Sequence, residues 1–396
     1  MSCGRPPPRV AGPSLAAVLR AGINGLSPSL PKRHWRIINA LLACRTPLLG
    51  GHRYLCRECG QTHFVPHSCR NRHCPVCQGG GARAWLAKQQ QALLPVPYFH
   101  LVFTLPHVLN PLIQQNQRVL YVLLFEAASQ TLLEFGQNRF GVQLGITAVL
   151  HTWSQTLMDH YHLHCIVTGG GISAEGAKWV SSSTRYLFAV RALSTVFRGK
   201  FCAGLERLYR GGQLQFHGKL AALASPSAYQ HLLLQAVSQK WVVYSKRPFG
   251  GPRQVLAYLS RYTHRVALSP RRLLALDPES RTVTFAWKDY AHGGKRKTMR
   301  LELGEFVRRF CLHLLPERFV KIRHFGFLGN RQRKLRVAQA RALLNQAATP
   351  AAAAAVPPQS DGVCPHCGSK LLVLVEIVPR VALALATMPP RALDSS

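Results

Sequence analysis

The sequence predicts an α+β protein in which an antiparallel sheet is flanked by helices and preceded by a small metal-binding module. Short β-prone segments alternate with longer helix-prone segments after residue 93. Two Cys-x-x-Cys pairs lie before that residue, at a spacing typical of structural zinc sites. With 396 residues, 47% of them hydrophobic, the chain can bury a sizeable core, and we expect two or three domains.

Composition divides the chain into four expected segments. Residues 1–32 begin with a Pro-, Gly- and Arg-rich stretch without an apolar core, which predicts a flexible segment and no signal peptide. Residues 33–92 are the predicted zinc-binding, DNA-contact domain, and residues 93–345 are the main α+β domain. Residues 346–396 open with an Ala- and Pro-rich run, which predicts a linker and a disordered tail.

The spacing of cysteines near the N-terminus predicts a zinc ribbon. Its expected ligands are the two pairs Cys56, Cys59, Cys74 and Cys77. Further donors in the same segment are enough for a second ion or for an alternative ligand set: Cys44, His52, His63, Cys69 and His73. Near the other end of the chain, Cys364-Pro-His-Cys367 is only half of a ribbon. No second pair follows it, so we expect no metal there.

Secondary-structure signals follow one another along the main domain. Predicted strands are residues 98–104, 143–151, 160–168 and 241–245. Predicted helices are residues 111–135, which a proline starts, residues 190–209 and 226–239, and a further helix opened by Pro252. Residues 282–288 and 298–303 predict a hairpin around His292-Gly293-Gly294-Lys295.

Alternating histidines mark one of the predicted strands. His160, His162 and His164 alternate with Tyr161 and Leu163, so on a strand the three imidazoles point to one face. A divalent metal needs neutral nitrogen donors that converge from one surface. The plainer interpretation is a solvated strand face with polar residues.

Two tyrosines lie one helical turn apart in the segment that Pro252 opens. Tyr258 and Tyr262 are at i and i+4, on one side of the predicted helix. The plainer interpretation is an aromatic pair that packs in a core. Beside a histidine metal site the phenols are candidate nucleophiles, because a metal that polarises a phosphate lowers the barrier to their attack. The product of that attack is a phosphotyrosine.

Three motifs together resemble the two-tyrosine HUH transposases of rolling-circle insertion sequences, the insertion sequence 91 family. They are the cysteine-rich residues 68–77, the His162-Leu163-His164 pair ahead of three glycines, and residues 246–266 around the tyrosines. The resemblance covers residues 33–341. It implies that residues 93–345 form a nuclease domain that nicks one DNA strand, bonds to its 5′ phosphate and releases a 3′ hydroxyl.

The resemblance also implies roles for individual residues. His162 and His164 match the paired metal ligands, and Tyr258 and Tyr262 match the nucleophiles. The implied metal is Mg²⁺ or Mn²⁺, whereas an imidazole-rich site alone suggests Mn²⁺ or Zn²⁺.

The third metal ligand is open at this stage. In related relaxases it is a histidine eleven residues before the pair, which is the position of His151. A hairpin between residues 143–151 and 160–168 would bring His151 towards that pair. His160 and Gln155 are the alternatives.

Charge predicts a polyanionic partner. The chain has 50 Lys and Arg against 15 Asp and Glu, a net charge of +35, which a ribosomal or chromatin protein would share. Between His100 and Tyr262 it has only Glu126, Glu134, Asp159, Glu175 and Glu206, none of them in a motif. This argues against a transposase built on three carboxylates that hold two metals.

Several basic residues are predicted to contact single-stranded element ends and target DNA: Arg70, Arg72, Arg261, Arg265, Lys321 and Arg323. The last two belong to residues 321–334, where basic and aromatic residues interleave as on a single-strand surface. The plainer interpretation of that stretch is a charged face that covers a core.

We expect a bacterial cytoplasmic, nucleoid-associated protein. The longest apolar candidate, residues 371–387, is broken by Glu376, Pro379 and Arg380, so no membrane span is expected. Two other functions stay open: a replication initiator or relaxase with the same chemistry, and a non-catalytic zinc-dependent DNA-binding protein. The sequence does not predict the oligomeric state.

Overall fold

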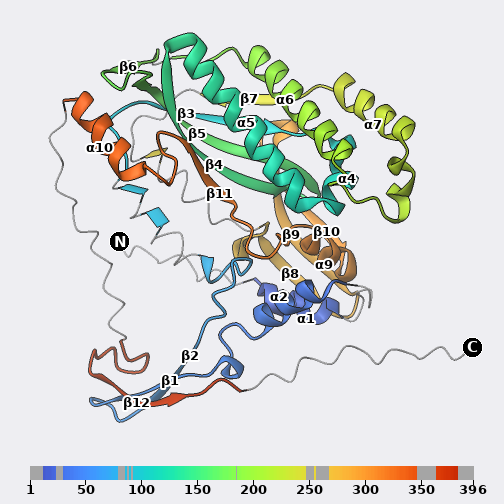
Figure 1. Cartoon of the computed structure of the whole chain (residues 1–396). Coiled ribbons are helices and arrows are strands. Elements are labelled where there is room, and N and C mark those ends of the chain that lie inside the picture. The colour runs from blue at the N-terminus through green and yellow to red at the C-terminus, as the bar shows by residue number, and fades with distance from the viewer. Residues whose placement is uncertain are drawn as a thin grey trace, which may run out of the picture.

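Two larger bodies and one small sheet make up the described part of the chain (Figure 1). The computed structural model describes residues 12–23, 30–78, 85–86, 89–90, 92–183, 185–246, 254–255, 267–345 and 363–381. The mixture of helices and antiparallel sheets confirms the predicted α+β class.

The largest body is built on a six-stranded antiparallel sheet of order β11-β4-β5-β3-β7, with β6 paired to β5. Its strands are β3 (Tyr98–Thr104), β4 (Val142–Trp153), β5 (Asp159–Ser173), β6 (Trp179–Ser181), β7 (Val242–Lys246) and β11 (Ile322–Gly326). The predicted strands are confirmed, and so is the predicted hairpin, because β4 and β5 pair antiparallel with His151 opposite His162.

Helices cover one face of this sheet (Figure 1). They are α4 (Asn110–Gln115), α5 (Gln117–Phe140), α6 (Val190–Arg210) and α7 (Pro226–Ser238). Alternate strand residues such as Leu101, Leu150 and Leu163 are buried in the core beneath them. The opposite face carries α10 (Arg333–Leu343), whose Val337 and Ala340 belong to a separate apolar cluster with Ile166.

The predicted helix at residues 111–135 is interrupted at Asn116. The side-chain amide of Asn116 donates to the carbonyl oxygens of Leu112 and Gln215. The side-chain oxygen of Asn116 accepts from the backbone amide of Gln215. By length and composition α5 could cross a membrane, but most of its apolar stretch is buried. This is the property of a core helix, since the residues it buries belong to the main core.

The second body is a three-stranded sheet with helices on it. Its strands are β8 (Leu273–Asp277), β9 (Thr282–Asp289) and β10 (Lys295–Glu302), and its helices are α1 (Leu15–Gly22), α2 (Lys32–Leu42) and α9 (Leu303–Leu312). The predicted hairpin between β9 and β10 is confirmed. Gly293 and Gly294 in its turn have φ of 71° and 72°, which favours glycine.

The expectation of a flexible segment at residues 1–32 is wrong where α1 forms. Leu15, Val18 and Leu19 are buried at i, i+3 and i+4, in one cluster with residues of α9. Ser14 caps the helix by accepting from the Ala17 amide. The prediction of a flexible segment rested on the Pro-rich residues before α1 and overlooked the short amphipathic helix that follows them.

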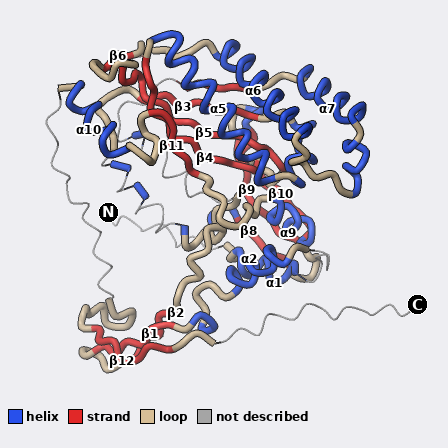
Figure 2. The backbone as a smooth tube through the Cα atoms, viewed as in Figure 1, coloured by secondary structure: helices blue, strands red, loops and turns tan. Residues whose placement is uncertain are grey.

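The small sheet has the order β12-β1-β2, so a late strand of the chain pairs with an early hairpin (Figure 2). Its strands are β1 (Gly51–Cys56), β2 (Thr62–Pro66) and β12 (Leu372–Val378). The expected disordered tail at residues 346–396 is therefore wrong for residues 363–381. Short 3₁₀ helices complete the elements: Pro47–Leu49, His107–Leu109, Gly218–Ala224, Pro270–Arg272 and Tyr290–His292.

We expect a buried histidine, His313, to make the fold sensitive to acid. His313 follows α9, is 4% exposed, and has Nε2 at 3.0 Å from the Leu157 carbonyl oxygen. Burial lowers the pKa of His313 to about 4, although the bond to Leu157 opposes the shift. The unfolded chain has the ordinary pKa near 6.5. Between these pH values the unfolded state therefore binds a proton that the folded state does not.

We predict that the free energy of unfolding falls as the pH is lowered from 6.5 to about 4, and that His313→Gln makes this fall shallower. One such group contributes up to about 1.4 kcal/mol per pH unit. Glutamine retains a donor for Leu157 but does not titrate. Denaturant unfolding at several pH values measures the slope, and equal slopes in both proteins would refute the assignment.

Candidate metal centre and nucleic-acid interface

Three histidines meet on the sheet face that α5 does not cover. Along β5, Tyr161 and Leu163 are buried in the core under the helices, so His162 and His164 point to the opposite face. His151 on β4 is registered against His162. The candidate ligand nitrogens of the three residues lie within 4.8 Å of one another. The structure thus brings together the pair and the third residue that the sequence analysis singled out.

The three imidazoles are buried, with 3% to 9% of each residue exposed. Burial, with the nearby His160 charge, lowers the pKa of His162 to about 3. Its imidazole is therefore neutral at physiological pH, which is the form that binds a metal. Ring centroids of His151 and His164 are 4.4 Å apart, and those of His162 and His164 are 4.9 Å apart. This donor set fits one divalent ion.

Neighbouring groups orient two of the three rings. His162 Nδ1 lies 2.8 Å from the His160 carbonyl oxygen, to which only a protonated nitrogen can donate, so Nε2 keeps its lone pair for a ligand. His164 Nδ1 lies 2.9 Å from Nε2 of His100, a buried residue of β3. When His164 binds through Nε2, its Nδ1 donates to His100. Such outer partners fix the ligand tautomer.

Sequence analysis missed His100. The signal was present, because His100 alternates with the core residues Phe99 and Leu101 of a predicted strand. Without the strand order, the sequence could not show that β3 lies beside β5. The pairing of β3 with β5 is what brings His100 to His164.

The geometry favours His151 over the two alternatives for the third position. His160 is adjacent to His162, with ring centroids 4.7 Å apart, but its Nδ1 lies 3.2 Å from Nε2 of His107, and it is not in the set of nitrogens that converge within 4.8 Å. Gln155 follows the strand in the turn, and its carbonyl oxygen accepts a hydrogen bond from Arg272. Among the described residues, the group that could hold a metal here is His151 with His162 and His164.

Both tyrosines lie outside the described residues, as do Arg261 and Arg265. The described residues on either side of that gap lie near the histidine face. Val255 is buried in one apolar cluster with Ile166, two residues beyond His164 on β5. Ala267 lines a small cavity with Trp153, whose ring stacks on His151 with centroids 4.6 Å apart.

The predicted single ribbon of Cys56, Cys59, Cys74 and Cys77 is wrong as a grouping. The structure forms two clusters instead: Cys44, Cys69, Cys74 and Cys77, and Cys56, Cys59, Cys364 and Cys367. The β1–β2 hairpin carries the first Cys-x-x-Cys pair away from the second, and β12 brings a new pair to it. Cys44 and Cys69 were open alternatives, whereas the expectation of no metal at Cys364 is contradicted by a complete set of donors.

The structure gives three predicted DNA contacts a packing role. The Arg72 guanidinium donates to the carbonyl oxygens of Leu315, Pro316 and Phe319. Arg323 stacks over Phe125, with its guanidinium carbon 4.6 Å from the ring centroid. Burial lowers the pKa of Lys321 to about 8, with a smaller effect of Arg72. The plainer interpretation, a charged face that covers a core, fits these residues better.

Arg70 is the described arginine that stays available among the predicted contacts. It is exposed and lines a cavity of about 460 Å³. The walls of this cavity come from residues 70–73, from α2 and from the segment after α9. That cavity is also lined by Arg33, Arg36 and Arg318, against one carboxylate, Glu317. Clustered guanidinium groups suit a phosphate backbone.

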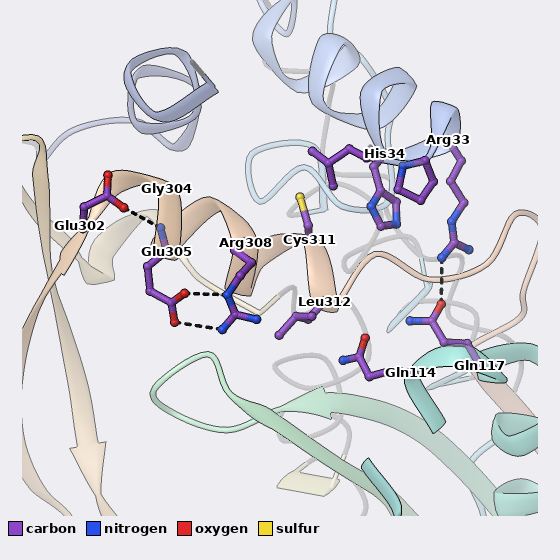
Figure 3. A pocket seen from close by; sticks show the side chains of 12 residues that line it. Arg33, His34, Gln114, Gln117, Glu302, Gly304, Glu305, Arg308, Cys311 and Leu312 are labelled. Atoms are coloured by element: carbon purple, nitrogen blue, oxygen red, sulfur yellow. Dashed lines mark hydrogen bonds and ion pairs between the residues drawn. The ribbon is translucent and has the colours of Figure 1, made fainter. Parts of the chain in front are cut away.

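A neighbouring cavity of about 630 Å³ has a different character (Figure 3). Its wall includes Glu302 and Glu305, and Glu305 is paired with Arg308 at 2.6 Å. The bond from Arg308 lowers the pKa of Glu305 to about 2, so this carboxylate stays charged. Arg33 donates to the side-chain oxygen of Gln117 at 3.1 Å. The mixed charge makes this cavity a poorer site for a nucleic-acid backbone than the cavity at Arg70.

Comparisons with known proteins agree with this arrangement. Residues 145–335 match a family model described as "Putative transposase", and residues 19–105 match the "Transposase zinc-binding domain". The chain is 40% identical over 402 residues to "Putative transposase y4qJ" of Sinorhizobium fredii, covering 98% of this chain and 99% of that protein. It is 31% identical over 300 residues to "Transposase for insertion sequence element IS801" of Pseudomonas savastanoi pv. phaseolicola, covering 74% and 70%. No solved structure matches the chain.

The chain therefore belongs to the transposases, enzymes that act on DNA. Within them it is a member of the insertion sequence 91 family, as its motifs indicated, and it carries that family's zinc-binding domain near the N-terminus.

We predict that His164→Ala abolishes Mn²⁺ binding at the histidine centre and that His100→Ala weakens it about 10- to 100-fold, the usual effect of losing an outer partner. His107→Ala is the matched control, because His107 contacts His160, which is outside the proposed ligand set. Electron paramagnetic resonance of free Mn²⁺ measures the affinity. Unchanged binding in His164→Ala would remove this residue from the ligand set.

We also predict that Arg70 and Arg72 respond differently to substitution. Arg72→Ala removes the side-chain donor to the carbonyl oxygens of Leu315 and Phe319, whereas that of Pro316 still accepts from the Phe319 amide. This loss lowers stability by about 1–3 kcal/mol. Arg70→Ala leaves the melting temperature unchanged but weakens DNA binding and reduces its salt dependence by about one charge. Thermal denaturation and anisotropy titrations against salt separate the two effects. Full stability with lost affinity in Arg72→Ala would contradict its packing role.

Proposed function

We propose that this transposase nicks and rejoins single DNA strands through attack of Tyr258 and Tyr262 on phosphates held at the histidine centre. The single observation that carries the proposal is the convergence of His151, His162 and His164 on one buried sheet face. The positions of Val255 and Ala267 support it, because the described chain borders that face on both sides of the tyrosines.

The residues of the chain hold and orient the reacting groups. When bound, Mg²⁺ or Mn²⁺ would polarise the scissile phosphate and offset its charge. The His160 carbonyl oxygen orients the His162 ring, and His100 orients the His164 ring, through the Nδ1 atom of each. A site ligated only by imidazole favours Mn²⁺ over Mg²⁺.

Cleavage and rejoining then balance without a further reagent. The tyrosine phenol loses its proton to solvent while its oxygen bonds to phosphorus, and the bond from phosphorus to the 3′ oxygen breaks. The 3′ oxygen takes up a proton and leaves as a hydroxyl. Rejoining is the reverse: a 3′ hydroxyl attacks the phosphotyrosine, and the phenol is released.

Two tyrosines serve two strands in this proposal. At i and i+4 of one helix their hydroxyls would address the same phosphate site in succession. One tyrosine keeps the first 5′ end while the other attacks a second phosphate. This arrangement suits rolling-circle transposition of an insertion sequence on single-stranded ends and targets, in the bacterial cytoplasm at the nucleoid.

Two alternatives fit the observations less well. A replication initiator or relaxase would use the same chemistry, but both relatives reported above, one of them matched over nearly its full length, are named as transposases. A non-catalytic zinc-dependent DNA-binding protein would leave three buried histidines in a cluster without a role.

Substitution of the tyrosines tests the proposal. We expect Tyr258→Phe and Tyr262→Phe each to keep some single-strand nicking but to fail in complete transposition, because only one covalent intermediate remains. The double variant should form no covalent DNA adduct. Tyr290→Phe is the control, since Tyr290 is an exposed phenol at the β9–β10 turn of the second body and not one of the proposed nucleophiles.

Mass spectrometry of trapped adducts locates the bond. An adduct on one tyrosine alone, with the other variant fully active in cells, would show a one-tyrosine enzyme. Adducts that persist in the double variant would refute the proposed nucleophiles.

A further inference from the structure

The second cysteine cluster joins parts of the chain that are far apart in sequence. Cys56 and Cys367 are 311 residues apart, and their sulfur atoms are 3.6 Å apart. The sulfurs of Cys59 and Cys364 are also 3.6 Å apart. Cys364 and Cys367 lie outside residues 19–105, which match the zinc-binding family. We infer that these four cysteines bind a second zinc ion, which clamps the C-terminal segment onto the N-terminal β1–β2 hairpin.

The sulfur distances fit a tetrahedral zinc site. With zinc–sulfur bonds of about 2.3 Å, the sulfurs of a tetrahedral site lie about 3.8 Å apart. A disulfide would need about 2.05 Å, and all four cysteines are free. The other cluster has the same spacing: Cys44 and Cys77 lie 3.5 Å apart, and Cys74 and Cys44 lie 3.7 Å apart.

The two halves of the second cluster have matching turns. In Cys56-Arg-Glu-Cys59-Gly60 the Gly60 amide donates to the Cys56 carbonyl oxygen at 2.9 Å, and Gly60 has φ of 70°. In Cys364-Pro-His-Cys367-Gly368 the Gly368 amide donates to the Cys364 carbonyl oxygen at 2.8 Å, and Gly368 has φ of 74°. A left-handed glycine after the second cysteine closes each loop around its sulfurs. Two equivalent knuckles facing each other make a complete zinc ribbon.

The small sheet has little besides this site to hold it together. None of the three apolar core clusters of the described residues contains a residue from 51–66 or 363–381. The ion pair between Arg53 and Glu376, at 2.7 Å, is about half exposed on both sides and so contributes little. The pairing of β1 with β12 remains. Sheets of this size without a core usually depend on a metal or a disulfide.

The two zinc sites differ in their surroundings. Cys74 is buried in the second core, against which Cys44, Cys69 and Cys77 pack. Cys367 is exposed, and the second site has no such cover. A chelator should therefore remove the zinc bound by Cys56, Cys59, Cys364 and Cys367 before it removes the zinc of the other cluster.

Zinc content of the purified full-length chain tests the ligand set. We expect two zinc ions per chain in the parent protein and one in Cys364→Ser/Cys367→Ser. Cys56→Ser/Cys59→Ser should also lose one ion, and the combined quadruple variant should still keep one, because both pairs hold the same ion. Cys202→Ser is the control, as a lone cysteine of α6. Two zinc ions in Cys364→Ser/Cys367→Ser, or none in the quadruple variant, would overturn the inference.

A cleavage experiment tests the clamp itself and does not depend on nuclease activity. A protease recognition sequence is inserted into the alanine run at residues 351–355, and the purified protein is cut there. We expect the C-terminal fragment to stay with the body during gel filtration, and to separate after chelator treatment. In Cys364→Ser/Cys367→Ser it should separate without a chelator.

Two outcomes of this experiment would count against the clamp. A fragment that separates from the parent protein while zinc is retained would show that the ion does not join the chain ends. A fragment that stays bound after complete zinc removal would show that strand pairing alone is sufficient.

Discussion

Antiparallel pairing of β4 with β5 is the constraint on which the candidate nuclease centre depends. It places His151 opposite His162, and the alternation of β5 turns His162 and His164 away from the helices. Because side chains alternate along a strand, a slip of one residue would turn these imidazoles into the apolar core. The burial of Tyr161 and Leu163 under α5 therefore fixes the register that assembles the histidines.

That same burial sets the protonation state of His162, whose pKa it lowers. An imidazole shielded from water loses the stabilisation of its charged form, so it stays neutral and available to a metal. His100 and the His160 carbonyl oxygen add orientation, because each contacts the Nδ1 atom of its histidine. Neighbouring strands of one sheet thus supply both the ligands and their supports.

The cysteine clusters show a second principle: ligands of one metal site can come from segments that are far apart in sequence. The first cluster rests on a core, whereas the second holds a sheet that has none. Arg72 also joins segments that are distant in sequence. It lies between Cys69 and Cys74 and donates to three backbone carbonyl oxygens in the segment before β11. A basic side chain in a DNA-binding protein can therefore serve the fold rather than the DNA.

Local signals were sufficient for much of this protein. Periodicity and turn residues predicted β3, the β4–β5 hairpin and the β9–β10 hairpin, because each depends on residues close in sequence. The same hairpin pointed to His151 as the partner of His162. Spacing along the chain indicated candidate residues for the proposed chemistry, and the family resemblance implied the role of each.

Contacts between distant segments were decided only by the tertiary structure. Which cysteines share a cluster depends on β12 meeting β1, and no local pattern encodes a pairing across about three hundred residues. The role of His100 depends on the order of strands, and the role of Arg72 on a loop far along the chain. Sequence spacing reports neighbours along the chain, whereas a ligand set or a packing contact is selected by neighbours in space.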